Sequence, residues 1–271
     1  MMNFFRISFA FLKRDILESS SYKFSYLFGL AGILGSLIFF FFLNKLITPG
    51  QNQYLAAYGG NYFAYVVIGI AFIGYLNISS SVFSGLLEAG ENSGTLEAIL
   101  LTPAKIYLLA FANSFWSFIF TTAHVLIYLL LGVIFFGLDL PRVNIPVLLL
   151  VLFICSIPLF LLGVISSALT LATKQSGFIN LLSGRAGKFL AGVYFPIGIF
   201  PAWLAKLTLL LPLTQGLEAI RKCALSGSNI AGVLPNLIYL IAVSIVLLPI
   251  SVFSFRWGFK KAKLYGNLVH R

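Results

Sequence analysis

Three of the seven acidic residues of this chain lie close together in a polar segment between two long apolar runs: Glu88, Glu91 and Glu97. Gly90 and Gly94 interrupt the preceding helical pattern, and Ser93 or Thr95 can cap a new helix whose first turn then contains Glu97. The helix dipole favours negative charge at that position. We therefore expect a helix that presents carboxylates to a binding partner.

The rest of the segment completes an amphipathic helix over 88–102. Leu96, Ile99 and Leu100 follow one another at helical spacing, and Pro103 ends the element. A short helix at a membrane surface, apolar on one side and acidic at its start, is suited to docking onto another protein.

The search for catalytic and metal-binding patterns finds none. His124 and His270 have no histidine, cysteine or carboxylate at ligand spacing. The segment 183–188, Ser-Gly-Arg-Ala-Gly-Lys, is similar to a phosphate-binding loop, but Leu182 replaces its first glycine and Phe189 its Ser or Thr. We expect no catalytic residue, no metal and no bound cofactor, so another protein must supply the energy for any work.

The composition indicates that membrane-spanning helices position these residues. The chain is 60% hydrophobic and 9% charged, whereas soluble domains carry about a quarter charged residues. Its apolar runs exceed the roughly 20 residues that cross a bilayer, and they are apolar on all sides, unlike barrel strands. We predict an all-α polytopic membrane protein with six spans, near 24–46, 61–86, 106–136, 146–172, 177–199 and 233–255.

Basic residues predict the orientation of these spans. Both terminal segments are basic, as are the connections at Lys105 and Lys174, and basic loops stay in the cytoplasm. The termini and the 88–102 helix are therefore expected on the cytoplasmic side of a plasma membrane, in a bacterium the inner membrane. The net charge of +11 reflects this topology and attraction to anionic lipid; nucleic-acid binding is the weaker explanation.

Residues 1–22 have the pattern of an interfacial helix. The apolar residues recur at helical spacing and the basic ones lie off that face: Phe5, Phe9, Leu12 and Ile16 against Arg6, Lys13 and Arg14. The helix is either a plain membrane anchor or an elbow that supports the docking surface.

Two cations interrupt the fifth predicted span. Arg185 and Lys188 either reach lipid headgroups from the cytoplasmic end of this helix or lie on a translocation path, where they meet an anionic group.

The segment after that span combines prolines with interfacial aromatic residues: Tyr194, Phe195, Pro196 and Trp203. This pattern predicts short helices over 200–215 that enter the outer leaflet and turn back. Glu218 and Arg221 lie three residues apart on one helix face and could pair. The region is either a structural lid or a gate at the outer end.

Three motifs carry a resemblance to a known family: Glu91-Asn-Ser-Gly-Thr-Leu-Glu97 with Leu101-Thr-Pro103, Gly192-Val-Tyr-Phe-Pro196 with Phe200-Pro-Ala-Trp203, and Leu211-Pro-Leu-Thr214 running to Glu218 and Arg221. The chain resembles the membrane subunit of ABC type-2 (ABC-2) exporters. The order of the motifs relative to the six spans also agrees, so the resemblance extends over nearly the whole chain. A departure is the charged pair in the fifth span, where the family is often uncharged.

The resemblance implies a role for each segment. The 88–102 helix would be the coupling helix that docks on a nucleotide-binding subunit, residues 1–22 the connecting helix, and 200–215 the re-entrant helices. Two permease chains, expected as a homodimer, and two ATPase subunits would form the complex. ATP and Mg²⁺ would bind only to the ATPase, so the permease is not itself an enzyme. The coupling residues would be Glu88, Glu91, Gly94, Thr95, Leu96, Glu97, Leu100 and Pro103.

The function implied by the resemblance is export of an amphiphile, such as a drug, lipid or antibiotic-like molecule, from the cytoplasm or inner leaflet. An alternative substrate is a lipid-linked polysaccharide. A secondary transporter is a further possibility, although it would normally place ionisable residues at the midplane of several spans. The candidate pathway and gate residues are Arg185, Lys188, Tyr194, Phe195, Pro196, Trp203, Glu218 and Arg221.

Overall fold

The computed structural model describes residues 4–21, 23–46, 54–55, 58, 60–80, 106–138, 140, 143–173 and 185–264. Those residues are 87% helical and include no strand, which confirms the predicted all-α class. The predicted 88–102 docking helix, with all its candidate residues from Glu88 to Pro103, lies outside the described residues.

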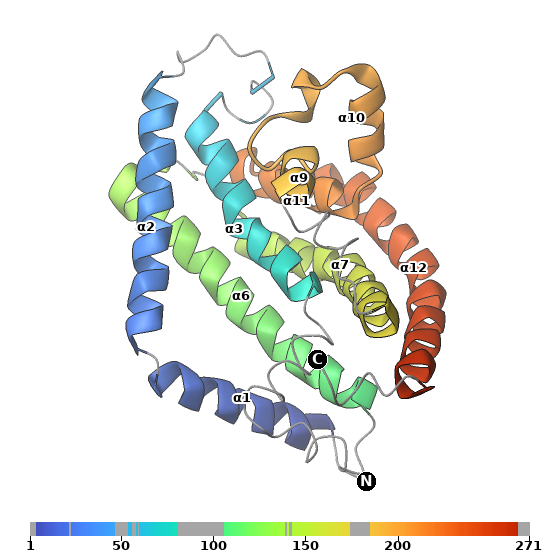
Figure 1. Cartoon of the computed structure of the whole chain (residues 1–271). Coiled ribbons are helices and arrows are strands. Elements are labelled where there is room, and N and C mark those ends of the chain that lie inside the picture. The colour runs from blue at the N-terminus through green and yellow to red at the C-terminus, as the bar shows by residue number, and fades with distance from the viewer. Residues whose placement is uncertain are drawn as a thin grey trace.

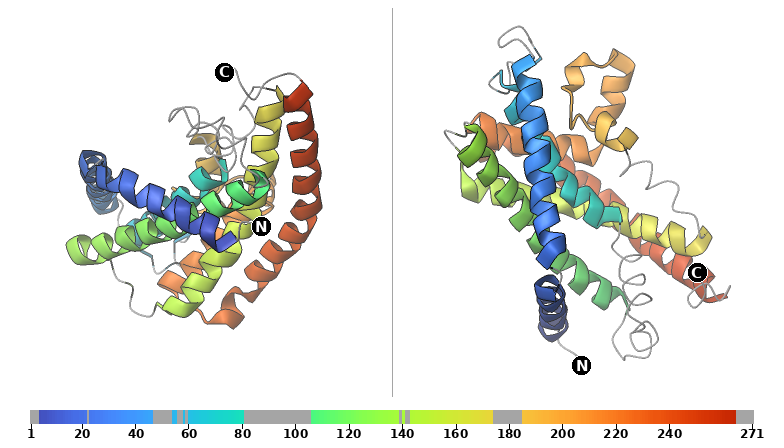
Figure 2. Two further views of the ribbon diagram at one scale, coloured as in Figure 1. Left: turned by 90° about the horizontal axis from the view of Figure 1, so that it is seen from below. Right: turned by 60° about the vertical axis from the view of Figure 1, so that its left-hand side comes forward.

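The described helices form a bundle (Figure 1). In chain order they are α1 (Phe4–Ser21), α2 (Lys23–Leu46), α3 (Tyr62–Ser80), α6 (Ile106–Phe136), α7 (Ile145–Thr173), α9 (Arg185–Leu190), the 3₁₀ helix η2 (Ile197–Ile199), α10 (Ala202–Leu209), α11 (Pro212–Leu225) and α12 (Ile230–Leu264). Helix α1 lies across one end of the bundle, and α9 and α10 lie toward the opposite end (Figures 1 and 2).

Four helices in the described part are long and apolar enough to cross a membrane: Leu27–Leu46 of α2, Phe115–Phe136 of α6, Ile145–Leu169 of α7 and Ile230–Gly258 of α12. Helix α3 adds a shorter apolar stretch, Tyr62–Tyr75. Helices α7 and α12 run side by side (Figure 2). Long apolar helices satisfy their own backbone hydrogen bonds, which is the condition for placing a chain in hydrocarbon.

Helix α3 lies at the centre of the bundle and is buried along most of its described length. It packs against α2, α6, α7 and α11. The ring of Phe63 lies 5.8 Å from that of Phe41 on α2, and the ring of Tyr75 lies 5.6 Å from that of Phe118 on α6. A helix that is apolar on every side can be covered on every side, so α3 is the packed central helix of the bundle.

The chain departs from the predicted arrangement in the fifth span. The sequence predicts one helix over 177–199, but in the described part of that range α9 ends before Gly192, where φ is +73°. Glycine adopts this left-handed conformation without a Cβ clash. The N–H of Gly192 donates to the carbonyl of Phe189 (3.1 Å), and that of Val193 to Lys188 (3.2 Å). This pair of bonds is a Schellman motif, which satisfies carbonyls at the C-terminal end of a helix. The end of α9 is therefore capped rather than frayed.

Residues 200–215, predicted to enter the membrane and turn back, form α10 and the first turn of α11. Backbone N–H groups of Leu210 and Leu211 donate to the carbonyls of Leu207 (3.2 Å) and Thr208 (3.0 Å), and α11 begins at Pro212. Proline is tolerated in a first helical turn because its missing N–H would have no partner there. The two short helices are therefore joined by a tight turn.

The packing around α3 generates a test of its central position. Phe72 is buried, and truncation to alanine leaves a cavity that its neighbours fill only in part. We expect Phe72→Ala to lower the free energy of unfolding by about 3 kcal/mol. Thermal unfolding of the purified chain in detergent measures this, with Phe42→Ala on the exposed side of α2 as the matched control. Equal effects of both variants would contradict the described core.

Candidate functional site

Helix α11 positions the candidate gate residues of the C-terminal half. Its buried side includes Leu217, Ile220 and Ala224, and it packs against α3, α7 and α12. Polar side chains of Gln215, Glu218 and Lys222 are only partly buried. Arg221 is the exception, because it is charged and yet lies on the buried side of this helix.

The Arg221 side chain is 2% exposed and donates only to backbone carbonyls in its described contacts. Nε and Nη2 both lie 3.3 Å from the carbonyl oxygen of Tyr65. Nη2 also donates to the carbonyls of Gly192 (3.0 Å) and Val193 (3.2 Å). The guanidinium lies over the Tyr65 ring, 3.5 Å from its centroid. One side chain thus connects α11, α3 and the turn after α9.

The turn after α9 explains why two of these acceptors, the carbonyls of Gly192 and Val193, are available. The last carbonyls of a helix have no partner within it, and a buried carbonyl without a donor costs roughly 1–3 kcal/mol. Arg221 supplies donors where the turn leaves acceptors. Burial lowers the pKa of Arg221, but arginine starts from so high a value that the guanidinium remains charged.

Tyr65 and Gly69 complete this contact from α3. The Tyr65 hydroxyl donates to the carbonyl of Gly192 (2.8 Å) and lies 3.2 Å from that of Phe195. A Cβ atom at Gly69 would lie 2.5 Å from the carbonyl oxygen of Val193 and 2.8 Å from Nη2 of Arg221. Only glycine permits so close an approach between α3 and the turn. We name this assembly the Arg221 clasp: Tyr65, Gly69, Gly192, Val193 and Arg221.

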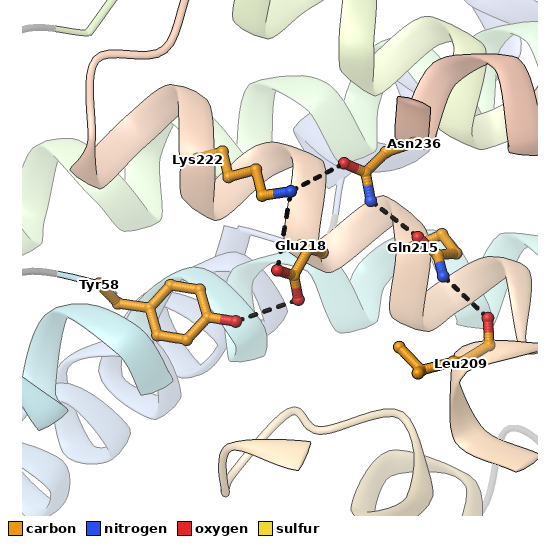
Figure 3. Close-up of polar contacts among 6 residues, drawn as sticks. All are labelled: Tyr58, Leu209, Gln215, Glu218, Lys222 and Asn236. Atoms are coloured by element: carbon orange, nitrogen blue, oxygen red, sulfur yellow. Dashed lines mark hydrogen bonds and ion pairs between the residues drawn. The ribbon is translucent and has the colours of Figure 1, made fainter. Parts of the chain in front are cut away.

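A second set of polar contacts surrounds the other side of α11 (Figure 3). The Tyr58 hydroxyl donates to Glu218 Oε2 (3.0 Å), and Lys222 Nζ lies 3.8 Å from Glu218 Oε1 and donates to Asn236 Oδ1 (3.1 Å). The chain of bonds continues from Asn236 Nδ2 to Gln215 Oε1 (2.7 Å). Its last member is the bond from Gln215 Nε2 to the carbonyl of Leu209 (2.9 Å). This polar network ties α11 to α12, to the end of α10 and to the segment before α3.

The predicted contact between Glu218 and Arg221 is replaced by these two separate sets of bonds. Glu218 bonds to Tyr58 and pairs with Lys222, one helical turn away, while Arg221 turns to the carbonyls of the broken helix. Spacing of three residues permits a pair, but buried acceptors cost more to leave unsatisfied than a partly exposed carboxylate. Burial and the Glu218 carboxylate raise the pKa of Tyr58, so its hydroxyl remains a donor.

A comparison with protein-family models matches residues 47–253 to the ABC-2 family transporter protein family, which is most of the chain. The chain belongs to the ABC-2 transporter family. It is therefore a multi-pass membrane permease of an ABC transporter, a transmembrane subunit without its own ATPase, and its family implies an ABC ATPase partner. A search of curated proteins found no match.

The other predicted gate residues of this ABC-2 permease fall into two groups. The Tyr194 ring stacks at 6.1 Å on Phe40 of α2, and the Phe195 ring stacks at 6.0 Å on Phe189 of α9. Pro196 is buried beside them. Trp203 lies apart on α10, where it is 66% exposed.

The two predicted cations of the fifth span belong to α9. Lys188 is half-buried, and its carbonyl closes the Schellman motif. Arg185 is the first residue of α9, and its side chain lies outside the described residues.

The sequence gives only weak signals for the Arg221 clasp and for the polar network around α11. A tyrosine such as Tyr65 inside an apolar run needs an acceptor for its hydroxyl, and Gly69 within the same run marks a close approach. Neither signal identifies the partner. Tyr58, Gln215 and Asn236 carry no pattern that separates them from other polar residues.

Removal of the Arg221 guanidinium tests the clasp in the ABC-2 permease. Arg221→Met keeps an unbranched apolar side chain but removes the described donor of the Val193 carbonyl and leaves the Gly192 carbonyl with the Tyr65 hydroxyl alone. We expect the free energy of unfolding to fall by about 3 kcal/mol. The neighbouring Lys222→Met, in a partly exposed ion pair, should cost less than about 1 kcal/mol. Thermal unfolding in detergent compares the two variants; an Arg221→Met protein as stable as Lys222→Met would refute the assignment.

Proposed function

We propose that this permease forms an ATP-driven exporter that moves an amphiphilic substrate out of the cytoplasm or the inner leaflet. In the proposed topology there are six spans, and both termini and the 88–102 segment lie on the cytoplasmic side of a plasma membrane. Helix α1 then lies at the inner end and α10 at the outer end. The opposite placement of these two helices in the bundle is consistent with this orientation.

The observation that carries the proposal is the broken fifth helix held by the Arg221 clasp. In a membrane, irregular backbone is tolerated only where protein covers it or where it lines a cavity. Residues 191–196 are such a segment, and α10 and α11 beside it are too short to span. We interpret this region as the outer gate and α10 with α11 as its re-entrant helices.

Helix α3 provides a physical link between the proposed docking segment and this gate. It ends at Ser80, shortly before 88–102, and α6 begins at Ile106, shortly after it. The other end of α3 carries Tyr65 and Gly69 of the clasp. Closure of the ATPase subunits on ATP would move the docked helix, and α3 would transmit that movement because it is packed on all sides. The permease then switches between two states through differences in contacts.

Two permease chains are proposed to form a homodimer with two ATPase subunits, which hold ATP and Mg²⁺. Helix α2 supports a contact with a second copy, since only 6% of an 18-residue apolar stretch within Leu27–Leu46 is buried in one chain. Added Cβ atoms at Gly29, Gly32 and Gly35 would meet nothing within 4 Å, and small residues let membrane helices approach closely.

Charge reversal of the docking helix tests the coupling. We expect Glu91→Lys and Glu97→Lys to reduce co-purification of the ATPase subunit at least tenfold and to abolish ATP-dependent transport, because each places a cation where the partner binds a carboxylate. Lys206→Glu on α10, at the opposite end, is the matched control for co-purification of the ATPase subunit. The measurement is a pull-down in mild detergent followed by transport in proteoliposomes.

The outcomes separate the competing functions. Undiminished transport by both variants would overturn the coupling role of 88–102. Transport driven by a proton gradient without an ATPase would replace the exporter with a secondary transporter. Export of a lipid-linked polysaccharide instead of a small amphiphile would retain the architecture and change the substrate.

A further inference from the structure

The last turns of helix α12 carry a cluster of cations at the end of an apolar span. The span runs from Ile230 to Gly258, and the turns around its end contain four basic residues: Arg256, Lys260, Lys261 and Lys263. Arg256 and Lys260 are exposed and lie four residues apart, so one face of the helix presents both. We name these two residues, together with the exposed Trp257, the α12 basic face.

Packing against α7 places this face on the outside of the bundle. The two helices run side by side (Figure 2). A Cβ atom at Gly258 would lie 2.4 Å from the carbonyl oxygen of Ala168 on α7, so Gly258 marks the side of α12 that contacts α7. Residues two positions apart lie on nearly opposite sides of a helix, because each residue turns it by about 100°. Arg256 and Lys260, each two positions from Gly258, therefore lie on the side away from α7.

Exposed apolar side chains extend the same face back along the span. Val246, Phe253 and Trp257 are all exposed, and steps of seven and four residues keep them on one side of the helix. Phe253 is 73% exposed and precedes Arg256 by three residues. An exposed apolar surface on a membrane-spanning helix is suited to contact with lipid tails. The cations then lie at the level where the headgroups begin.

The neighbouring helices supply no acidic partner for these cations. Helix α12 packs chiefly against α7 and α11. Neither α7 nor α12 contains an acidic residue, and the single acidic residue of α11, Glu218, bonds to Tyr58 and pairs with Lys222. Arg256 and Lys260 form no ion pair with another described residue. The face therefore presents two cations to an anion from outside the chain.

A phosphate headgroup matches the three side chains. Arg256 can donate two parallel hydrogen bonds to phosphate oxygens, and Lys260 supplies a compact positive charge one turn away. The long stems of both residues can lie along apolar surface while their charged ends reach the headgroups. Tryptophan is enriched at this level of a membrane. The Trp257 ring also has Lys261 Nζ 5.2 Å from its centroid, which adds positive charge beside it.

A contact of this face with its own copy is the weaker alternative. Two identical chains in a membrane are related by a two-fold axis, so a contact between two α12 helices would bring each residue close to its counterpart. Arg256 and Lys260 would then face the same cations, and like charges placed opposite each other are unfavourable.

An acidic surface of the ATPase subunit is a second alternative. Such a surface would account for the two cations but not for Phe253 and Trp257, which are exposed on the same face. A lipid accounts for both, because it combines an anionic headgroup with apolar tails.

We propose that the α12 basic face binds the headgroup of an anionic phospholipid at the surface where this span ends, which is the inner leaflet in the proposed topology. The tails of the lipid cover the exposed side of α12 around Phe253, and its phosphate lies against Arg256 and Lys260. The lipid is a bound partner of the permease and not the transported substrate, so the inference goes beyond the proposed export function.

Native mass spectrometry of the full-length permease measures this binding. The chain in mild detergent is titrated with phosphatidylglycerol, which is anionic, or with phosphatidylcholine of the same tails, which is zwitterionic. Each basic residue near an anionic surface increases affinity about fivefold. We therefore expect Arg256→Gln combined with Lys260→Gln to weaken phosphatidylglycerol binding about 25-fold. Arg256→Lys combined with Lys260→Arg, which keeps both charges, should retain most of the affinity.

The matched control removes the same charge elsewhere. Lys45→Gln combined with Lys206→Gln changes two exposed lysines on α2 and α10, toward the opposite end of the bundle, and should leave the affinity for phosphatidylglycerol unchanged. Equal affinity of the unmodified permease for the two lipids would overturn the proposal. Equal losses in the two charge-removing variants would do so as well, because they would show a response to net charge alone.

Crosslinking locates the lipid and separates the possible occupants. Diazirine-labelled phosphatidylglycerol should label peptides within 245–260, and labelling confined to other helices would reject the site. A disulfide between two Phe253→Cys chains in native membranes would assign the face to a second copy and overturn the proposal. Loss of the ATPase subunit from the Arg256→Gln, Lys260→Gln permease, with unchanged lipid affinity, would assign it to the ATPase and overturn it too. The lipid-binding measurements use neither ATP nor transport, so a failure of the export function would leave their result unaffected.

Discussion

The structure depends on a charged group that is buried in an apolar bundle. Arg221 can stay there only because the chain provides backbone carbonyls at the right place, and those carbonyls are free only because α9 ends at a glycine turn. Each defect would be costly alone: a buried cation without acceptors, and a helix end without donors. Together they offset one another. The clasp therefore defines where α3, α11 and residues 191–196 meet.

This arrangement suits a protein whose work is mechanical. This permease has no ATPase of its own, and we interpret its polar groups as contacts that hold segments in defined positions and release them. The clasp is rigid because it is buried and made by one planar group. The polar network on the other side of α11 is partly exposed and made of longer, more flexible side chains. The two sides of α11 thus differ in the energy needed to separate them from their neighbours.

Much of the fold follows from the sequence, because apolar runs of this length leave a chain in hydrocarbon little choice but helices. The break at Gly192 was signalled by glycine and Pro196, yet the apolar residues around it favoured one continuous span. The partners of Arg221 could not be predicted from the sequence, because every residue has a backbone carbonyl and the residue type does not show which carbonyl accepts a bond. The spacing of three residues permitted a pair with Glu218, but Arg221 bonds instead to backbone carbonyls of other segments. Docking of the 88–102 helix stays a prediction, because that segment lies outside the described residues.

The distances along the chain between the members of the clasp have a consequence for biogenesis. Tyr65 precedes Arg221 by 156 residues, and Gly192 precedes it by 29. A ribosome therefore releases α3 and the broken end of α9 into the insertion machinery before the guanidinium that satisfies them has been translated. Until α11 arrives, the carbonyl of Val193 must bond to water or to an insertase, and that of Gly192 has only the Tyr65 hydroxyl. Folding of this half of the permease is thus a late event in synthesis, completed only once α11 has left the ribosome.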